Sequence, residues 1–429
     1  MIIFFIAFPI VAVLTFSPSF FNRFIKTQPK RFYVENRFKP VNKENTHIIY
    51  HNSTLFSKLE NHCFAQIGSN PKHLTNTSYS WFDGDGMIHG VYFEKGQITY
   101  QNKWIQTKRL NVEDRIGKKV YLYLAEFIDK NGLFKFMIYS LKRYLHIIPG
   151  VKGTANTALL ETNNRFFALH EGDLPYELEI KTNPFNISTK GIVEIPDTFS
   201  TTAHPIKDDK RDQLYMCSYN NYNFKDGKFI FNVFNKDLVK IQDKNISLLN
   251  NGIVHSTSFT GNKLIIPDMP MKFDPLRIFT NRLPLYFDKH NGVTRFGILD
   301  VDDPTNIDWY HFDENFYVFH FSDSYETPDE YIIYACVIRN INIEAFIFFE
   351  KNDPTNKGNG LIRKIRLNKK TKRGTVIRNK QIEDMDVDFC YNTDFPITSK
   401  LNTKDIYCCI FDSNKASISG YLKINTDDF

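Results

Sequence analysis

From about residue 33 onward, the chain is built of short runs in which apolar residues alternate with polar ones or stand together. Polar turn sequences separate these runs, as in FDGDG at 82–86, KDGK at 225–228 and DDPTN at 302–306. Alternation with a period of two predicts strands, because successive side chains of a strand point to opposite faces of a sheet. Many short strands joined by polar turns predict a sandwich, a barrel or a propeller. The sequence contains no strict internal repeat, so this pattern alone does not choose among the three.

Residues 133–148 (LFKFMIYSLKRYLHII) depart from the strand pattern. They combine bulky apolar side chains with Lys135, Lys142 and Arg143, and they contain no turn residue. This mixture predicts an amphipathic helix that lies on a membrane surface. An ordinary helix packed on the protein core is the alternative.

The first 22 residues carry no charge and are followed by Arg23 and Lys26. This arrangement predicts either an apolar leader or a membrane anchor whose basic flank lies in the cytosol. Pro9 and Pro18 interrupt the apolar run, so both interpretations stay open.

The composition favours an all-β protein and gives no support for nucleic-acid binding. Phe (40) and Tyr (22), both frequent in strands, are heavily used. The net charge of +6 is small for 429 residues and is spread along the chain. The six cysteines form no C-x-x-C pair, which indicates buried thiols in a reducing compartment such as the cytoplasm.

Three of the twelve histidines lie in segments predicted as strands or strand edges: His204 in TTAHP, His255 in GIVHSTSF and His320 in FYVFHFSDS. A single histidine in such a segment is usually structural. Their separations of 51 and 65 residues, however, are near the roughly 40–50 residues of one propeller blade, and the inner strands of successive blades converge on one axis. Neutral imidazoles at that axis would suit Fe(II) and leave an open position for O₂.

Several longer segments carry a family resemblance. They are GSNP at 68–71, WFDGDGMIHGVYFEKGQITYQNKW at 81–104, GTANTALLETNNRFFALHEGDLPYEL at 153–178, IIPDMPMKF at 265–273, RFGILD at 295–300 and VFHFSDSYETPDE at 318–330. With the His204 and His255 segments, they resemble in the same order the motifs of the carotenoid cleavage oxygenases, also called the retinal pigment epithelial membrane protein family. The plant-type carotenoid cleavage dioxygenases are the most similar, and the resemblance extends from about residue 33 to the C-terminus.

The resemblance implies an all-β, seven-bladed β-propeller over residues 33–429, with its last blade incomplete and a short amphipathic helical insertion at 133–148. It implies that His204, His255 and His320 are iron ligands. Glu171, in HEGDLPY, matches a carboxylate that orients a ligand histidine, and Asp388 occupies the place of the next such acid. His89, inside the MIHG motif, is interpreted as structural.

The chain departs from the family pattern at several positions. No histidine follows His320, so the fourth ligand of the family, in a C-terminal F-H-G-like segment, is missing, as is its third orienting glutamate. Ser256 stands where the family has Asp, and Ser69 where it has Pro. We interpret both serines as neutral substitutions.

The expected function is an Fe(II)-dependent dioxygenase that cleaves a conjugated double bond of a carotenoid or apocarotenoid with O₂ and gives two carbonyl products. The protein is expected to be membrane-associated on the cytoplasmic side, through residues 133–148. The alternative is a truncated, non-catalytic family member that binds an apolar ligand or a membrane surface, because the fourth ligand is missing. A retinoid isomerase or a stilbene-cleaving relative would share the metal chemistry, and the sequence leaves the substrate open.

Overall fold

The computed structural model describes residues 39–51, 54–74, 80, 82–128, 131–150, 153–219, 228–250, 252–280, 282–339, 341–344, 361–377, 405–412 and 417–426. The predicted leader at 1–22 and Asp388 lie outside these residues. The chain forms two compact units, one comprising Met1–Glu194 with Pro275–Pro284 and the other comprising Ile195–Asp274 with Leu285–Phe429. No helix within the described ranges is long and apolar enough to cross a membrane.

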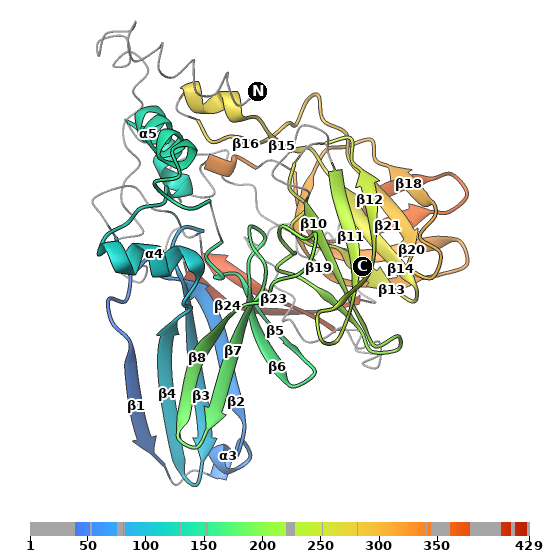
Figure 1. Ribbon diagram of the computed structural model, residues 1–429. Helices are drawn as coiled ribbons and strands as arrows, with labels where there is room; N and C mark the ends of the chain where they lie inside the picture. Colours follow the sequence, from blue (N-terminus) through green and yellow to red (C-terminus); the bar gives the residue numbers. More distant parts are fainter. Residues whose placement is uncertain are drawn as a thin grey trace, which may run out of the picture. The chain divides into compact units, whose positions relative to one another are not determined.

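The first unit contains two four-stranded antiparallel sheets (Figure 1). One sheet has the order β1-β4-β3-β2 and the other the order β5-β6-β7-β8. The strands are β1 (Asn45–Tyr50), β2 (Cys63–Ser69), β3 (Gly86–Glu94), β4 (Gln97–Trp104), β5 (Ala158–Thr162), β6 (Arg165–Leu169), β7 (Tyr176–Thr182) and β8 (Phe185–Ile192). Buried side chains of both sheets, among them Ile88, Leu178 and Ile187, form a shared core. The turn between β3 and β4 needs positive φ at Lys95 and Gly96, which glycine adopts without strain.

Short helices interrupt the sheets, and those given bounds within the described residues are α3 (Thr54–Ser57), α4 (Lys108–Ile116), η3 (Leu124–Ile128), α5 (Gly132–Tyr144) and η5 (Pro275–Thr280). Helix α4 begins after Thr107, whose side chain accepts a hydrogen bond from Leu110 N, and ends at Gly117 with φ of 72°.

The helix predicted at 133–148 is present as α5, although α5 ends four residues earlier, at Tyr144.

A buried glutamate holds α5 against the segment before it. Glu126 accepts hydrogen bonds from Tyr123 N at 2.9 Å and Lys135 Nζ at 3.0 Å, and it forms an ion pair with Lys119. Burial by itself would raise the pKa of Glu126, but the Lys119 charge and these hydrogen bonds bring the pKa below its ordinary value of 4.5. The ionised carboxylate therefore stabilises the fold above about pH 4.5, and this contribution is lost as the pH falls through the lowered pKa.

We expect Glu126→Gln to lower the free energy of unfolding at neutral pH. In acid, this difference from the wild type should disappear. The amide keeps the shape of the carboxylate but cannot ionise, so wild type and variant should converge as the pH falls from about 6 to about 3. Urea unfolding midpoints measured across this range check the expectation. A difference between the two proteins that stays constant with pH would contradict it.

The second unit contains a four-stranded antiparallel sheet of order β12-β11-β10-β9 and an eight-stranded sheet of order β13-β14-β17-β18-β22-β21-β20-β19 (Figure 1). Within the eight-stranded sheet, β18 and β22 pair in parallel between His311 and Arg373, and the other neighbouring strands are antiparallel. The strands are β9 (Ile206–Asp208), β10 (Gln213–Tyr219), β11 (Lys228–Asn235), β12 (Lys240–Ser247), β13 (Ser258–Thr260), β14 (Lys263–Asp268), β17 (Arg295–Asp300), β18 (Ile307–His311), β19 (Tyr317–Glu326), β20 (Glu330–Ile338), β21 (Leu361–Asn368) and β22 (Arg373–Ile377).

The described part of the second unit also contains two strand pairs: β15 (Met271–Phe273) with β16 (Leu285–Phe287), and β23 (Asp405–Asp412) with β24 (Ser417–Asn425). Ile406, Cys408 and Ile424 of the β23–β24 pair pack on buried residues of β20 and β21. The sheet of β9–β12 packs in turn on β14 and β17 through buried residues such as Phe231, Leu264 and Leu299. Successive sheets of this unit thus share apolar cores.

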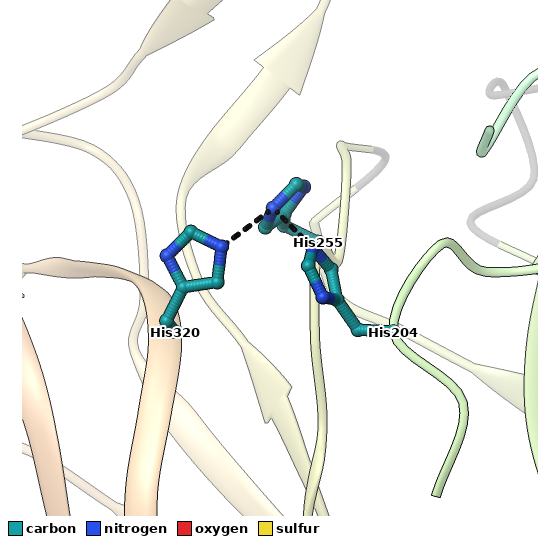
Figure 2. Close-up of side chains that lie close together, drawn as sticks. All are labelled: His204, His255 and His320. Atoms are coloured by element: carbon teal, nitrogen blue, oxygen red, sulfur yellow. Dashed lines mark hydrogen bonds between the residues drawn. The ribbon is translucent and has the colours of Figure 1, made fainter. Parts of the chain in front are cut away.

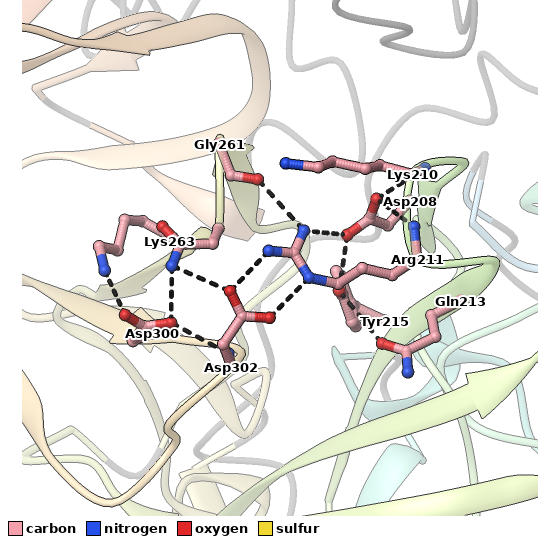
Figure 3. Close-up of polar contacts among 10 residues, drawn as sticks. Asp208, Lys210, Arg211, Gln213, Tyr215, Gly261, Lys263, Asp300 and Asp302 are labelled. Atoms are coloured by element: carbon pink, nitrogen blue, oxygen red, sulfur yellow. Dashed lines mark hydrogen bonds and ion pairs between the residues drawn. The ribbon is translucent and has the colours of Figure 1, made fainter.

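An arginine also joins neighbouring sheets of the second unit (Figure 3). Arg211, in the β9–β10 turn, donates to both carboxylate oxygens of Asp302 at 2.7 and 2.6 Å and to Asp208 Oδ2 at 2.8 Å. Asp208 is buried and also accepts from the Tyr215 hydroxyl at 2.8 Å. The planar guanidinium can serve both carboxylates at once, which an ammonium group cannot do with the same geometry.

We expect Arg211→Gln to lower the free energy of unfolding by about 1.5–3 kcal/mol, because the variant leaves the buried Asp208 without its cation. Urea unfolding measures the loss. The matched control is Arg373→Gln, since the Arg373 pair with Asp313 is exposed, and such pairs contribute at most about 1 kcal/mol. Equal losses in the two variants would show that Arg211 is not a link between sheets.

Candidate metal centre

Three histidines reach the same point of the second unit from three separate segments. His204 lies in the loop before β9, and His255 lies in the stretch before β13. His320 lies within β19, where the pairing with β20 shifts register between Val318 and Phe321. An irregular stretch of this kind changes the direction of a side chain relative to the regular pleat. The three segments are far apart in sequence, and only the fold brings them together.

The three imidazole rings converge through their Nε2 atoms (Figure 2). His204 Nε2 lies 2.9 Å from His255 Nε2, which lies 3.2 Å from His320 Nε2. One ligand atom from each of the three residues lies within 4.8 Å of the others. The ring planes cross at 61–84°, so the rings do not stack on one another. All three side chains are half-buried.

This arrangement fits a divalent metal ion. Imidazole nitrogens bind such ions at about 2.1 Å, so two ligands at right angles around one ion lie about 3 Å apart. The two measured Nε2 separations, 2.9 and 3.2 Å, are close to that value. Three Nε2 atoms facing one another are stabilised by a cation between them, because each neutral ring can direct a lone pair at it. Among the described residues, this is the one group of three or more histidine, cysteine or acidic side chains with such geometry.

The three candidate ligands are imidazoles, and a partly buried acidic side chain, Asp323, lies on the same strand as His320. Asp323 lies three residues beyond His320, and burial raises the pKa of its carboxyl above the ordinary value, although a hydrogen bond from Ser324 N opposes this shift. A site built from imidazoles leaves the charge of the ion uncompensated by its ligands. It also leaves coordination positions for other molecules.

Tyrosine hydroxyls hold the backbone that carries His255. The Tyr219 hydroxyl accepts a hydrogen bond from Val254 N and lies 3.3 Å from the Val254 carbonyl oxygen. The Tyr317 hydroxyl donates to the carbonyl oxygen of Ile253 at 3.1 Å. Gly252 begins this segment, where a Cβ atom would come within 1.1 Å of the Met271 carbonyl oxygen. The loop is therefore fixed immediately before the histidine.

The structure brings together three of the five predicted site residues. Glu171 lies in the turn after β6, half-buried, in the other compact unit, and its orienting role stays a prediction. The role of Asp388, outside the described residues, stays a prediction as well. His89 lies in β3, where its Nδ1 is 2.8 Å from the Tyr100 hydroxyl within the same sheet.

Ser69 and Ser256, both interpreted as neutral substitutions, each make a hydrogen bond to a distant carbonyl, and their neutrality stays a prediction. Ser69 Oγ donates to the carbonyl oxygen of Asp83, in the turn before β3. Ser256 Oγ donates to the carbonyl oxygen of Phe319, the residue before His320. Neither Pro nor an ionised Asp at these positions can donate such a hydrogen bond. Neither contact could be predicted from the sequence, because a serine gives no sign of which distant carbonyl it will reach.

An apolar face is exposed on α5 of the first unit. Phe134, Ile138, Leu141 and Leu145 follow one another at the spacing of one helix face, and each is 39–54% exposed. Lys142 and Arg143, both exposed, lie in the last turn of the helix. The opposite side contacts the protein, with Phe136 against Phe127 and Tyr139 against Tyr121. The helix is thus amphipathic with its outer face apolar.

The family model described as retinal pigment epithelial membrane protein matches residues 57–428. The chain belongs to this family of carotenoid cleavage oxygenases. Curated relatives include the carotenoid 9,10(9′,10′)-cleavage dioxygenase 1 of Arabidopsis thaliana and the carotenoid 9,10(9′,10′)-cleavage dioxygenase of Crocus sativus. Each is 28% identical over 84% of this chain. The chain spans 66% and 65% of the lengths of these two relatives.

Solved structures of the family share the fold. The lignostilbene dioxygenase of Pseudomonas brassicacearum aligns with a TM-score of 0.70 at 15% identity, covering 94% of this chain and 84% of that one. The cobalt-substituted Synechocystis ACO, an apocarotenoid oxygenase, aligns with a TM-score of 0.68 at 16% identity, covering 96% and 82%. The predicted β-propeller of the carotenoid oxygenase type is therefore confirmed.

Proposed function

We propose that the chain is an Fe(II)-dependent dioxygenase that cleaves a conjugated double bond of a carotenoid or apocarotenoid with O₂. The observation that carries the proposal is the convergence of His204, His255 and His320, whose Nε2 separations of 2.9 and 3.2 Å fit one metal ion. The names of the plant relatives, which are carotenoid cleavage dioxygenases, support the substrate class.

Each part of the proposed site has a distinct task. The three imidazoles would hold Fe(II) through Nε2, which leaves Nδ1 of each ring to carry its proton. Glu171 and Asp388 would each accept a hydrogen bond from such an Nδ1–H group and fix the orientation of that ring. When bound, the iron would supply the means to activate O₂ for addition across one double bond of the polyene. The alkene supplies the electrons, so the reaction gives two carbonyl products without an organic cofactor.

The test uses the full chain, purified in detergent and loaded anaerobically with Fe(II). Bound iron per chain is measured first, and an apocarotenoid is then supplied with O₂ while the products are separated and identified. Close to one iron per chain together with two carbonyl fragments would support the proposal. Iron without cleavage products would refute it for this substrate class, and the stilbene-type and retinoid substrates would then be tried. Folded protein without iron would favour the non-catalytic alternative, in which the chain binds an apolar ligand or a membrane.

We also propose that α5 places the protein on a membrane surface, on the cytoplasmic side. The exposed apolar side chains of α5 are suited to the acyl-chain boundary, and the exposed Lys142 and Arg143 beside them are suited to anionic headgroups. Carotenoids are apolar and dissolve in membranes rather than in water, so an enzyme attached there would meet its substrate. Membrane contact would therefore fit the proposed substrate class.

A further inference from the structure

Thr202 joins the first histidine segment to the second. Its Oγ1 accepts a hydrogen bond from His204 N at 3.1 Å and lies 3.5 Å from the carbonyl oxygen of His255, to which it can donate. The side chain is buried, so water competes little for these contacts. A single hydroxyl thus connects the main chains of two of the three histidines.

Ser256 joins the second histidine segment to the third. Its buried hydroxyl donates to the carbonyl oxygen of Phe319, and Phe319 directly precedes His320. That carbonyl lies in the irregular stretch of β19, where the register with β20 shifts between Val318 and Phe321. A contact at this place can fix how the strand presents the His320 ring.

We infer that Thr202 and Ser256 form a hydroxyl clamp that positions the three imidazoles for metal binding. This inference rests on the proposed function of the same site. Two hydrogen bonds of Thr202 connect His204 to His255, and one of Ser256 connects the His255 segment to the His320 strand, so the three bonds together link all three histidines. Metal affinity depends on how well the ligands are held before the ion arrives, and loss of such supporting contacts costs about 10–100-fold in affinity. Both residues are positioning residues, since neither hydroxyl is one of the three metal ligands.

The test is a titration of the metal-free full chain with Co²⁺, whose visible absorption reports the number and geometry of its ligands. We expect Ser256→Ala and Thr202→Val to raise the Kd for Co²⁺ about 10-fold each and to change the absorption spectrum. We expect Ser256→Thr, which keeps the hydroxyl, to have a Kd for Co²⁺ and an absorption spectrum close to those of the wild type. Ser256→Asp should behave like Ser256→Ala, because an ionised carboxylate cannot donate to the Phe319 carbonyl.

Ser258→Ala is the matched control. Ser258 lies two residues after Ser256, and its hydroxyl, 3.0 Å from the Ser324 hydroxyl, joins β13 to β19. Its removal therefore costs a similar buried hydrogen bond. We expect this control to lower the melting temperature about as much as Ser256→Ala and to leave the Kd for Co²⁺ unchanged.

The outcomes separate the clamp from the proposed function. Wild-type protein that binds Co²⁺ with the same Kd and spectrum as Ser256→Ala and Thr202→Val would overturn the clamp while leaving the metal site intact. Equal losses of affinity in Ser256→Ala and Ser258→Ala would overturn it too, since the effect would then be one of general stability. Folded wild-type protein that binds no Co²⁺ would overturn the proposed metal function and the clamp with it.

Discussion

We expect His255→Ala to lower the affinity of the chain for Fe(II) or Co²⁺ by more than about 100-fold and to abolish any oxygenase activity. His255 is the central member of the group, because its Nε2 lies within 3.2 Å of both other Nε2 atoms. Its removal leaves two imidazoles, and direct ligands contribute more to affinity than the contacts that support them. Equilibrium dialysis with metal analysis measures the loss.

The control for this experiment is His89→Ala. His89 is also half-buried in a strand, but it contacts the Tyr100 hydroxyl within the first unit. This variant should keep the metal affinity of the wild type. Retention of one tightly bound metal per chain in His255→Ala, with a folded protein by circular dichroism, would show that the three-histidine group is not the metal site.

The three histidines could be predicted because each lies in a short motif with a recognisable local sequence. His204 in TTAHP, His255 in GIVHSTSF and His320 in FYVFHFSDS are each identified from their immediate neighbours. The spacing and order of the three histidines can be taken from the sequence, whereas the 2.9 and 3.2 Å separations depend on the pairing of strands distant in sequence. Such pairing is a property of the whole fold.

The hydroxyl contacts could not be predicted for a different physical reason. Serine and threonine form hydrogen bonds with backbone groups in almost any setting, so their sequence neighbours do not identify the partner. Ser256 reaches a carbonyl 63 residues away, and Thr202 reaches one 53 residues away. At position 256, comparison with the family pattern led us to interpret the serine as a neutral substitution, and the pattern gave no sign of its contact with the Phe319 carbonyl.

The C-terminal end of α5 could not be predicted from the apolar pattern of the sequence either. The apolar sequence continues to Ile148, yet the helix ends at Tyr144. His146 adopts a left-handed conformation with φ of 54°, and the N–H groups of His146 and Ile147 donate to the carbonyl oxygens of Arg143 and Lys142. Glycine usually occupies this position at helix ends, so no local signal marked the stop.

We expect replacement of Phe134, Ile138 and Leu141 together by Gln to lower the partition of the protein onto vesicles at least about 100-fold. These side chains are 54%, 39% and 41% exposed on the outer face of α5, and Gln keeps the helix while removing the apolar surface. Transfer of one large apolar side chain out of water contributes about 1.5–3 kcal/mol when complete, so three partly inserted side chains suffice for this loss. Sedimentation with vesicles of phosphatidylcholine and phosphatidylserine measures the partition.

The matched control replaces Ile48, Ile49 and Tyr50 of β1 by Thr. These three apolar side chains are 52–77% exposed, against 39–54% for those of α5, and they lie on a strand rather than on a helix that carries Lys142 and Arg143. If binding required only exposed apolar surface, the β1 variant would lose as much affinity as the α5 variant, and that result would contradict a specific role for the helix. If α5 is the membrane contact, only the α5 variant dissociates from the vesicles. The double variant Lys142→Gln with Arg143→Gln should then reduce binding most on vesicles rich in phosphatidylserine, since each basic side chain near such a surface contributes about 1 kcal/mol.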